Sequence, residues 1–176
     1  MPETAAKVCG TCSMCCKLPS IAELGKPAGV WCQHVLKGKG CGIYEARPEV
    51  CRAFRCSWLR DPGSPDNWRP DRCGFVVREH KGSVLWIEVE PTRPLAWREP
   101  PFYAQIKQWA GLAIADRGAV VVACARSLTI VLPDKDVPIG VPVEGDEFEG
   151  AFEMRNGIRR NFVRVTHADG SFTDHG

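Results

Sequence analysis

Apolar positions follow a regular pattern only in the second part of the chain. Segments 75–78 and 84–89 are short and rich in β-branched and aromatic residues, and His80-Lys-Gly-Ser83 lies between them. Runs of this kind on either side of a turn sequence predict two strands. Segment 120–132 predicts one long strand or two short ones, and Asn156-Gly157 in the tail predicts a hairpin.

One amphipathic helix is predicted after Pro100-Pro101. The spacing of three and four residues gives a single apolar face, and Gly118 is a natural stop for the helix. The apolar positions are Phe102, Ile106, Trp109, Ala110, Ala113 and Ile114. Strands around a single helix predict the α+β class.

Residues 9 to about 60 lack such a period and are interrupted by Gly and Pro. Ser20 is a candidate helix cap with Glu23 as its capping-box partner, and that helix would end at Gly25 or before Pro27. A second short helix would begin with Pro48 at its first position. Residues 60–73 are interpreted as a linker or ordered loop. The sequence thus predicts an irregular cysteine-rich metal-binding module with short helices over 1–73. It would be packed, as one globular unit, on a small antiparallel sheet with one amphipathic helix over 74–176.

Composition and charge narrow the function classes. The chain has 176 residues and a formal net charge of +2, which gives no strong electrostatic footprint for nucleic acid or an anionic membrane. Residues 1–60 hold nine Lys or Arg against four Asp or Glu, so the positive charge accompanies the cysteines. No signal-like or membrane-spanning apolar stretch is visible, and we expect a cytoplasmic protein.

Cysteine spacing is the strongest chemical signal. Four cysteines form a C-x-x-C-x-x-C-C run, and four more follow before residue 60. In a reducing compartment so many cysteines favour metal or redox chemistry over a disulfide scaffold. The eight candidate metal ligands are Cys9, Cys12, Cys15, Cys16, Cys32, Cys41, Cys51 and Cys56.

The identity of the metal stays open between two chemistries. Thiolates favour zinc, copper(I) and iron–sulfur clusters. The two-residue steps of Cys9, Cys12 and Cys15 match the run that binds a cubane (4Fe-4S) cluster in bacterial ferredoxins. Zinc more often uses two separated C-x-x-C pairs, so the spacing favours iron–sulfur. Eight thiols exceed one four-coordinate site, so either two sites exist or some cysteines are redox partners.

Other residues near the cysteines allow weaker interpretations. His34 is an alternative ligand or a partly exposed histidine. Arg47, Arg52 and Arg55 could offset thiolate charge, bind an anionic partner or form a solvated helix face. Cys73 and Cys124 are interpreted as small buried hydrophobic residues.

The first third of the chain resembles a known family. The eight-cysteine order is accompanied by Ile43-Tyr44-x-x-Arg47-Pro48-x-x-Cys51-Arg52-x-Phe54-x-Cys56, and together they resemble the CxxCxxCC family of zinc- or iron-chelating domain proteins. The resemblance covers roughly residues 9–60 and implies a metal-binding cysteine module, with zinc or an iron–sulfur cluster left open. Flagellin lysine methylases carry a similar cluster, but this chain shows no methyltransferase cofactor motif.

These observations predict an iron–sulfur protein in electron transfer, in redox or metal sensing, or in support of a partner enzyme. The alternatives are a structural zinc module that mediates a protein or ligand interaction, and a metalloenzyme with an open metal position at Cys16 or His34. No nucleophilic catalytic motif is found, so an enzyme is the less favoured class. A protein is the candidate partner, and we expect no interaction with nucleic acid or with a membrane.

Overall fold

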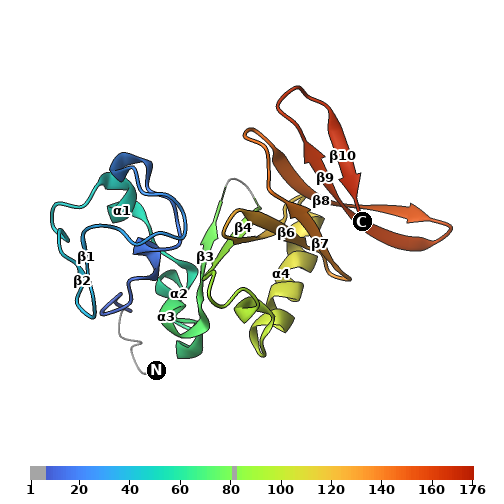
Figure 1. Ribbon diagram of the computed structural model, residues 1–176. Coiled ribbons are helices and arrows are strands. Elements are labelled where there is room, and N and C mark those ends of the chain that lie inside the picture. Colours follow the sequence, from blue (N-terminus) through green and yellow to red (C-terminus); the bar gives the residue numbers. More distant parts are fainter. Residues whose placement is uncertain (1–6, 81–82) are drawn as a thin grey trace. The chain divides into compact units, whose positions relative to one another are not determined.

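The computed structural model describes residues 7–80 and 83–176. Its fold is mixed, with few helices and several sheets, and is compatible with the α+β class (Figure 1). The chain divides into two compact units. We call the part up to Arg78 together with Glu88–Trp97 the cysteine unit, and Glu79–Ile87 with Arg98–Gly176 the second unit. The predicted modules 1–73 and 74–176 stay predictions.

Short elements make up most of the cysteine unit. Gly and Pro interrupt the sequence too often for longer helices to form. Its 3-10 helices are η1 (Met14–Cys16), η2 (Ala22–Leu24) and η3 (Asp66–Trp68). Its α-helices are α1 (Glu49–Ala53), α2 (Ser57–Arg60) and α3 (Pro70–Cys73). The strands β1 (Val35–Leu36) and β2 (Gly40–Cys41) form a two-stranded antiparallel sheet.

Three local predictions in this unit need correction. The helix near residue 20 is η2, its N-cap is Ile21, and no side chain caps it, so the Ser20–Glu23 capping box is wrong. It does end at Gly25, which is left-handed. Pro48 is the N-cap of α1 and not its first residue. Segment 60–73 contains η3 and α3 and is therefore more than a loop.

The periodic second part of the sequence forms the predicted elements. Segments 75–78 and 84–89 give β3 (Phe75–Glu79) and β4 (Leu85–Val89), while the predicted turn at 80–83 falls partly outside the described residues. The predicted helix is α4 (Phe102–Ala115), preceded by η4 (Ala96–Arg98). Segment 120–132 gives two strands, β5 (Val120–Cys124) and β6 (Ser127–Val131). Asn156 and Gly157, both with positive φ, join β8 (Glu147–Arg155) to β9 (Ile158–Thr166), as predicted.

Two larger sheets complete the topology. One has the strand order β3-β4-β5-β6-β7, with β7 at Asp136–Gly140, and the other has the order β10-β9-β8, with β10 at Phe172–His175. The pairs β5–β6, β6–β7, β8–β9 and β9–β10 are antiparallel. The chain passes from the cysteine unit to the second unit at the end of β3, between Arg78 and Glu79. It returns to the cysteine unit inside β4, between Ile87 and Glu88.

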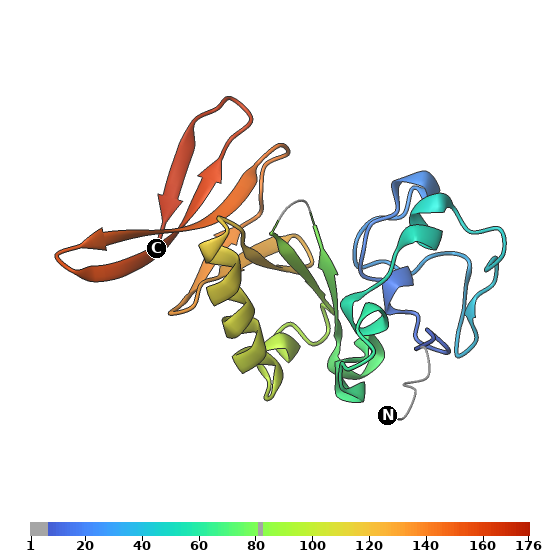
Figure 2. The same cartoon turned by 180° about the vertical axis from the view of Figure 1, so that it is seen from behind.

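The core of the second unit lies between α4 and its strands. Helix α4 contacts β5, β6 and β8, and Figure 2 shows it running beside these strands. Ile114 of α4 packs in one cluster with Val121, Ile130 and Val163, all of which are buried. Asp136 at the start of β7 accepts hydrogen bonds from Tyr103 Oη (3.0 Å) and Lys107 Nζ (2.8 Å) of α4, and these bonds fix the register between helix and strand.

The end of α4 differs in one detail from the prediction. The left-handed residue after the helix is Arg117 (φ 56°), and Gly118 follows it. Gly118 is required for another reason: a Cβ on it would lie 2.1 Å from the carbonyl oxygen of Ser83. The Gly118 carbonyl also accepts a hydrogen bond from the N–H of Gly150 (2.9 Å). Close backbone approach makes this position a glycine.

Throughout the described ranges, no helix combines the length and apolarity that a membrane span needs.

Candidate metal centre

The cysteine run folds as two successive tight turns. The N–H of Cys12 donates to the carbonyl of Cys9 (3.0 Å), and the N–H of Cys16 donates to the carbonyl of Ser13 (2.8 Å) at the start of η1. Gly10 has a φ of 54°, a left-handed conformation that glycine adopts without strain. Four sulfur-bearing side chains are therefore presented from a segment of only eight residues.

Two more cysteines are connected to this run through backbone hydrogen bonds and strand pairing. The N–H of Cys32 donates to the carbonyl of Cys16 (2.8 Å), and the carbonyl of Cys32 accepts from the N–H of Val35 (3.1 Å). Val35 is in turn the register partner of Cys41 across the β1–β2 pair. Cys51 lies on α1. The backbone bonds thus join Cys16, Cys32 and Cys41 in one continuous path.

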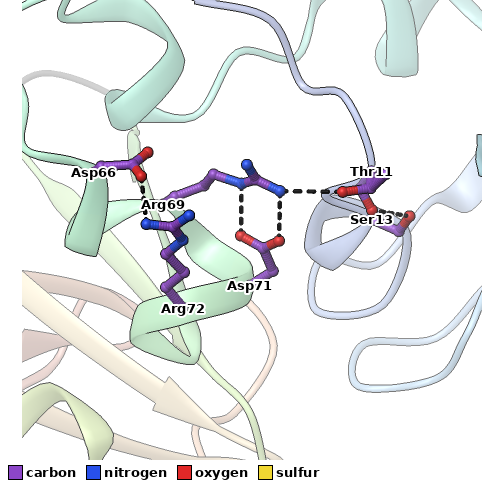
Figure 3. A network of polar contacts seen from close by, with 6 residues as sticks. All are labelled: Thr11, Ser13, Asp66, Arg69, Asp71 and Arg72. Carbon is purple, nitrogen blue, oxygen red and sulfur yellow. Dashed lines mark hydrogen bonds and ion pairs between the residues drawn. The ribbon is translucent and has the colours of Figure 1, made fainter. Parts of the chain in front are cut away.

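A network of polar side chains holds the first turn against α3 (Figure 3). Arg69 donates two hydrogen bonds to Asp71, at 2.8 and 2.7 Å, and a third to Thr11 Oγ1 at 3.2 Å. Thr11 lies between Cys9 and Cys12, and Ser13 Oγ donates to its carbonyl at 3.4 Å. A second ion pair joins Arg72 to Asp66. The network anchors the run to a segment almost sixty residues away in the sequence.

Seven of the eight predicted ligands line one cavity of about 220 Å³. His34 and Arg47 also line it, together with apolar side chains that include Ile21, Ile43 and Phe54. Cys56 is not among the lining residues; it packs with Cys12 against the buried cluster of Met14, Leu18 and Val76. The cysteines that line the cavity are Cys9, Cys12, Cys15, Cys16, Cys32, Cys41 and Cys51.

All ten cysteines of the chain lie in the described ranges, and none of them forms a disulfide. The disulfide scaffold is therefore not what the structure contains. Within these same ranges, no three His, Cys, Asp or Glu side chains come close enough together to hold a metal ion.

Cys73 is buried, as predicted, and its thiol donates to the Phe75 carbonyl (3.2 Å). Cys124 is only partly buried, so that prediction is wrong for Cys124.

The neighbouring thiols Cys15 and Cys16 differ strongly in acidity. A hydrogen bond between the two side chains, with Cys15 as donor, raises the pKa of Cys15 far above its usual value, and burial adds to the rise. The same bond lowers the pKa of Cys16 to about 7, against the effect of burial and with help from the charges of Lys26 and Arg47. Cys16 is therefore the thiol best prepared to be a thiolate near neutral pH.

Lys26 supplies a buried positive charge beside the cavity. Its Nζ donates to the carbonyls of Lys17 (2.8 Å), Pro27 (3.0 Å) and Pro19, which hold the ammonium in place. Burial lowers its pKa, and the thiolates of Cys32 and Cys16 oppose that shift. Sequence analysis missed Lys26, because the local sequence Gly25-Lys26-Pro27 does not indicate which groups surround the ammonium in the fold.

The predicted arginines have different surroundings. Arg47 lines the cavity, lies over the Tyr44 ring (3.6 Å) and donates to the Tyr44 carbonyl (2.8 Å). Arg52 pairs with Glu49 at 3.0 Å on the exposed face of α1, and Arg55 is exposed. Of the three, Arg47 has a charge effect on a cysteine, since it lowers the pKa of Cys16.

Comparison of the chain with protein-family models, with curated proteins and with solved structures finds no match. The cysteine unit must therefore be interpreted from its own geometry.

Proposed function

We propose that the cysteine unit binds metal through its eight cysteines and that the bound group is an iron–sulfur cluster rather than a zinc ion. The observation that carries the proposal is the cavity of about 220 Å³ lined by seven free thiols. Thiolates are the ligands that iron–sulfur clusters and zinc both prefer. A cavity of this size has room for a polynuclear group, and the two-residue steps of Cys9, Cys12 and Cys15 favour a cluster over zinc.

Charge around the cavity suits anionic ligands. Lys26 and Arg47 both lower the pKa of Cys16, so part of the negative charge of bound thiolates is compensated on site. Backbone N–H groups of Met14 and Asp71 partly offset the effect of burial, which raises the pKa of Cys12. Because the thiols are not gathered at ligating distance in the described parts of the chain, binding must draw the sulfurs together by rotating side chains and moving short turns.

From the cysteine order we propose that the protein is related to the CxxCxxCC family and that it acts in electron transfer, in redox or metal sensing, or in support of a partner enzyme. An iron–sulfur cluster would supply one-electron redox chemistry. A cytoplasmic location and a protein partner belong to the same proposal. The location rests on the many cysteines of the sequence, which in a reducing compartment favour metal or redox chemistry.

Metal and sulfide analysis after anaerobic isolation tests the proposal. The protein should be brown and contain iron and acid-labile sulfide. Replacing Cys15 and Cys16 together with Ser should abolish metal binding, whereas the matched control Cys124→Ser should retain it, because Cys124 lies on β5 of the second unit.

Two results would contradict the proposal at different levels. A colourless protein with stoichiometric zinc and no iron would replace the cluster with the structural zinc module. Stoichiometric metal in the Cys15/Cys16 variant would exclude the cysteine run as the binding site altogether. Spectroscopic detection of an exogenous ligand on the metal would favour the enzyme alternative, with Cys16 or His34 at the open position.

A further inference from the structure

The end of the β8–β9 hairpin extends beyond the rest of its sheet. Strand β10 pairs with β9 only at residues 163–166, so residues 151–162 form a ribbon of two strands. We call residues 151–162 the arm, and Figures 1 and 2 show it projecting away from α4. Residues 152–160 are all exposed. An isolated two-stranded ribbon is only marginally stable in water, so another strand would stabilise the arm.

The outer edge of β8 carries backbone groups that point away from β9. Strand β8 is at one edge of the order β10-β9-β8. The N–H of Gly150 donates out of this sheet to the Gly118 carbonyl (2.9 Å). Because the direction of backbone groups alternates along a strand, the N–H and C=O groups of Phe152 and Met154 point the same way. Among the described residues, no backbone group bonds to Phe152 or Met154 on that side. An edge of this kind is a template for pairing with another strand.

One face of the arm presents exposed apolar side chains at this edge. Phe152 and Met154 are two residues apart on β8 and so lie on the same face. They are 47% and 62% exposed. Arg159, the register partner of Met154 on β9, lies 4.1 Å from the centroid of the Phe152 ring. A strand added at the edge of β8 would place its side chains beside Phe152 and Met154 and bury part of this surface.

The other face of the arm carries charges of both signs at the same edge. Glu153 and Arg155 flank Met154 in the sequence and therefore point to the opposite face. Glu153 is 3.8 Å from Arg160 of β9, and both side chains are half exposed, so this ion pair is weak. Arg155 is exposed and has no ion pair with any described residue. Both charges are therefore available to a strand added at the edge.

These charges make β8 complementary to itself. When two copies of β8 pair antiparallel with Met154 opposite Met154, Glu153 of each copy lies opposite Arg155 of the other. A slide of two residues is the smallest that keeps the backbone hydrogen bonds in phase, and it sets either Glu153 opposite Glu153 or Arg155 opposite Arg155. Opposite charges stabilise a cross-strand pair, and like charges directly opposite destabilise it. The charge pattern therefore selects one register.

We propose that the arm is a dimerisation surface, in which the outer edge of β8 pairs with β8 of a second copy of this chain across a two-fold axis at Met154. The two Met154 residues bond to each other through N–H and C=O groups, as opposite residues of an antiparallel pair do. Met154 of one copy also meets the diagonal Phe152 of the other. The interface is isologous, since the same patch contributes on both copies. This inference goes beyond the proposed metal binding and is independent of it.

Sedimentation equilibrium of the full chain tests the proposal. The protein is kept metal-free and reduced, which excludes intermolecular disulfides. Its concentration is varied from about 1 µM to about 1 mM, because small interfaces bind weakly. The wild type should show a monomer–dimer equilibrium. Met154→Pro, with far-UV circular dichroism unchanged, should be monomeric over this range, since proline removes an N–H that faces the second copy and leaves the bonds to β9 intact.

Charge reversal tests the register. Glu153→Arg places Arg opposite Arg at two points of the dimer, and Arg155→Glu places Glu opposite Glu. Each variant should raise the dissociation constant roughly tenfold or more. An equimolar mixture of the two variants should form a heterodimer with the affinity of the wild type, because each Arg then faces a Glu. Glu144→Arg is the matched control: it makes the same charge change at an exposed residue of the loop before β8, and it should match the wild type.

The outcomes decide the proposal without reference to metal. A wild type that stays monomeric throughout the range would overturn it and leave the arm to a different protein. If both charge variants dimerise as tightly as the wild type, the interface lies away from the arm and the proposal is wrong. Absence of the heterodimer in the mixture would overturn the register at Met154. None of these results depends on iron, zinc or sulfide content, so the proposed function is tested separately.

Discussion

Cys16 combines three influences that no other cysteine of the run has together. It accepts a hydrogen bond from Cys15, and it lies near the charges of both Lys26 and Arg47. The thiolate is the reactive form of cysteine, so the acidity of this group can be measured directly by its rate of alkylation.

In the metal-free protein, we expect Cys16 to be the fastest thiol of the run to react with iodoacetamide near neutral pH. Its pKa of about 7 lies below the ordinary 9.0, so the thiolate fraction rises with pH and reaches one half near pH 7. Lys26→Met should move this midpoint to higher pH, because the nearby positive charge is lost. Mass spectrometry of the alkylated peptides as a function of pH gives the midpoint.

Lys37→Met is the matched control, because Lys37 is exposed on the short β1–β2 connection. It should leave the midpoint where it is. Equal midpoints in wild type and Lys26→Met would mean that the buried ammonium does not act on Cys16. The sequence could predict that Cys16 carries chemistry, but not that Lys26 does. That information depends on the carbonyls of Lys17, Pro19 and Pro27, which come together only in the fold.

At the scale of elements, the sequence predicts long periodic segments well and short ones poorly. Helix α4 repeats its apolar spacing along its whole length, and β8 and β9 flank a two-residue turn whose residues both need positive φ. Helices η3 and α3 are one turn each, too short for any period to show. The Ser20 cap failed because Ile21 instead exchanges backbone hydrogen bonds with Lys26, which closes a different turn.

Two glycines of the second unit, one in a crowded and one in an open environment, give a stability prediction. Gly118→Ala places a Cβ 2.1 Å from the Ser83 carbonyl oxygen, so the backbone must shift, and we expect a loss of about 1–3 kcal/mol in the free energy of unfolding. Gly111→Ala, inside α4 with nothing within 4 Å of the new Cβ, should instead gain up to about 1 kcal/mol from helix propensity.

Urea unfolding of both variants, followed by circular dichroism, measures these changes. The pair is matched, since the chemical change is the same and both residues belong to the second unit. A Gly118→Ala protein as stable as the wild type would show that the close approach to Ser83 can relax without cost. A Gly111→Ala protein less stable than the wild type would show that α4 needs flexibility at that position.

At the scale of the whole molecule, the cysteine unit is discontinuous in sequence. It includes Glu88–Trp97, which follow a segment that belongs to the second unit. Lys17 pairs with Glu90 at 2.6 Å, with both side chains largely buried, and Val76 of β3 packs with Met14 and Leu18. The resemblance to a cysteine family covers only residues 9–60, so sequence analysis could not show that later strands complete this unit.

Fragments of two lengths test the importance of these later residues. We expect a fragment of residues 1–97 to bind as much metal per chain as the full protein. A fragment of residues 1–73 should bind less and should be cleaved faster by trypsin, because it lacks Val76 and Glu90. Metal analysis and the rate of limited proteolysis measure both effects. Equal metal content and equal resistance in the two fragments would show that residues 74–97 are dispensable for the cysteine unit.

This discontinuity has a consequence for the order in which the protein is made. The last of the eight thiols, Cys56, leaves the ribosome 41 residues before Trp97, the end of the unit. At about 5–20 residues per second, roughly 2–8 s pass between the two events. During that interval the thiols are present on the nascent chain without Glu90, the partner that later holds Lys17 beside Cys16. If the cysteine unit binds metal as proposed, synthesis itself provides a period in which the ion can reach the cysteines before the residues up to Trp97 are added.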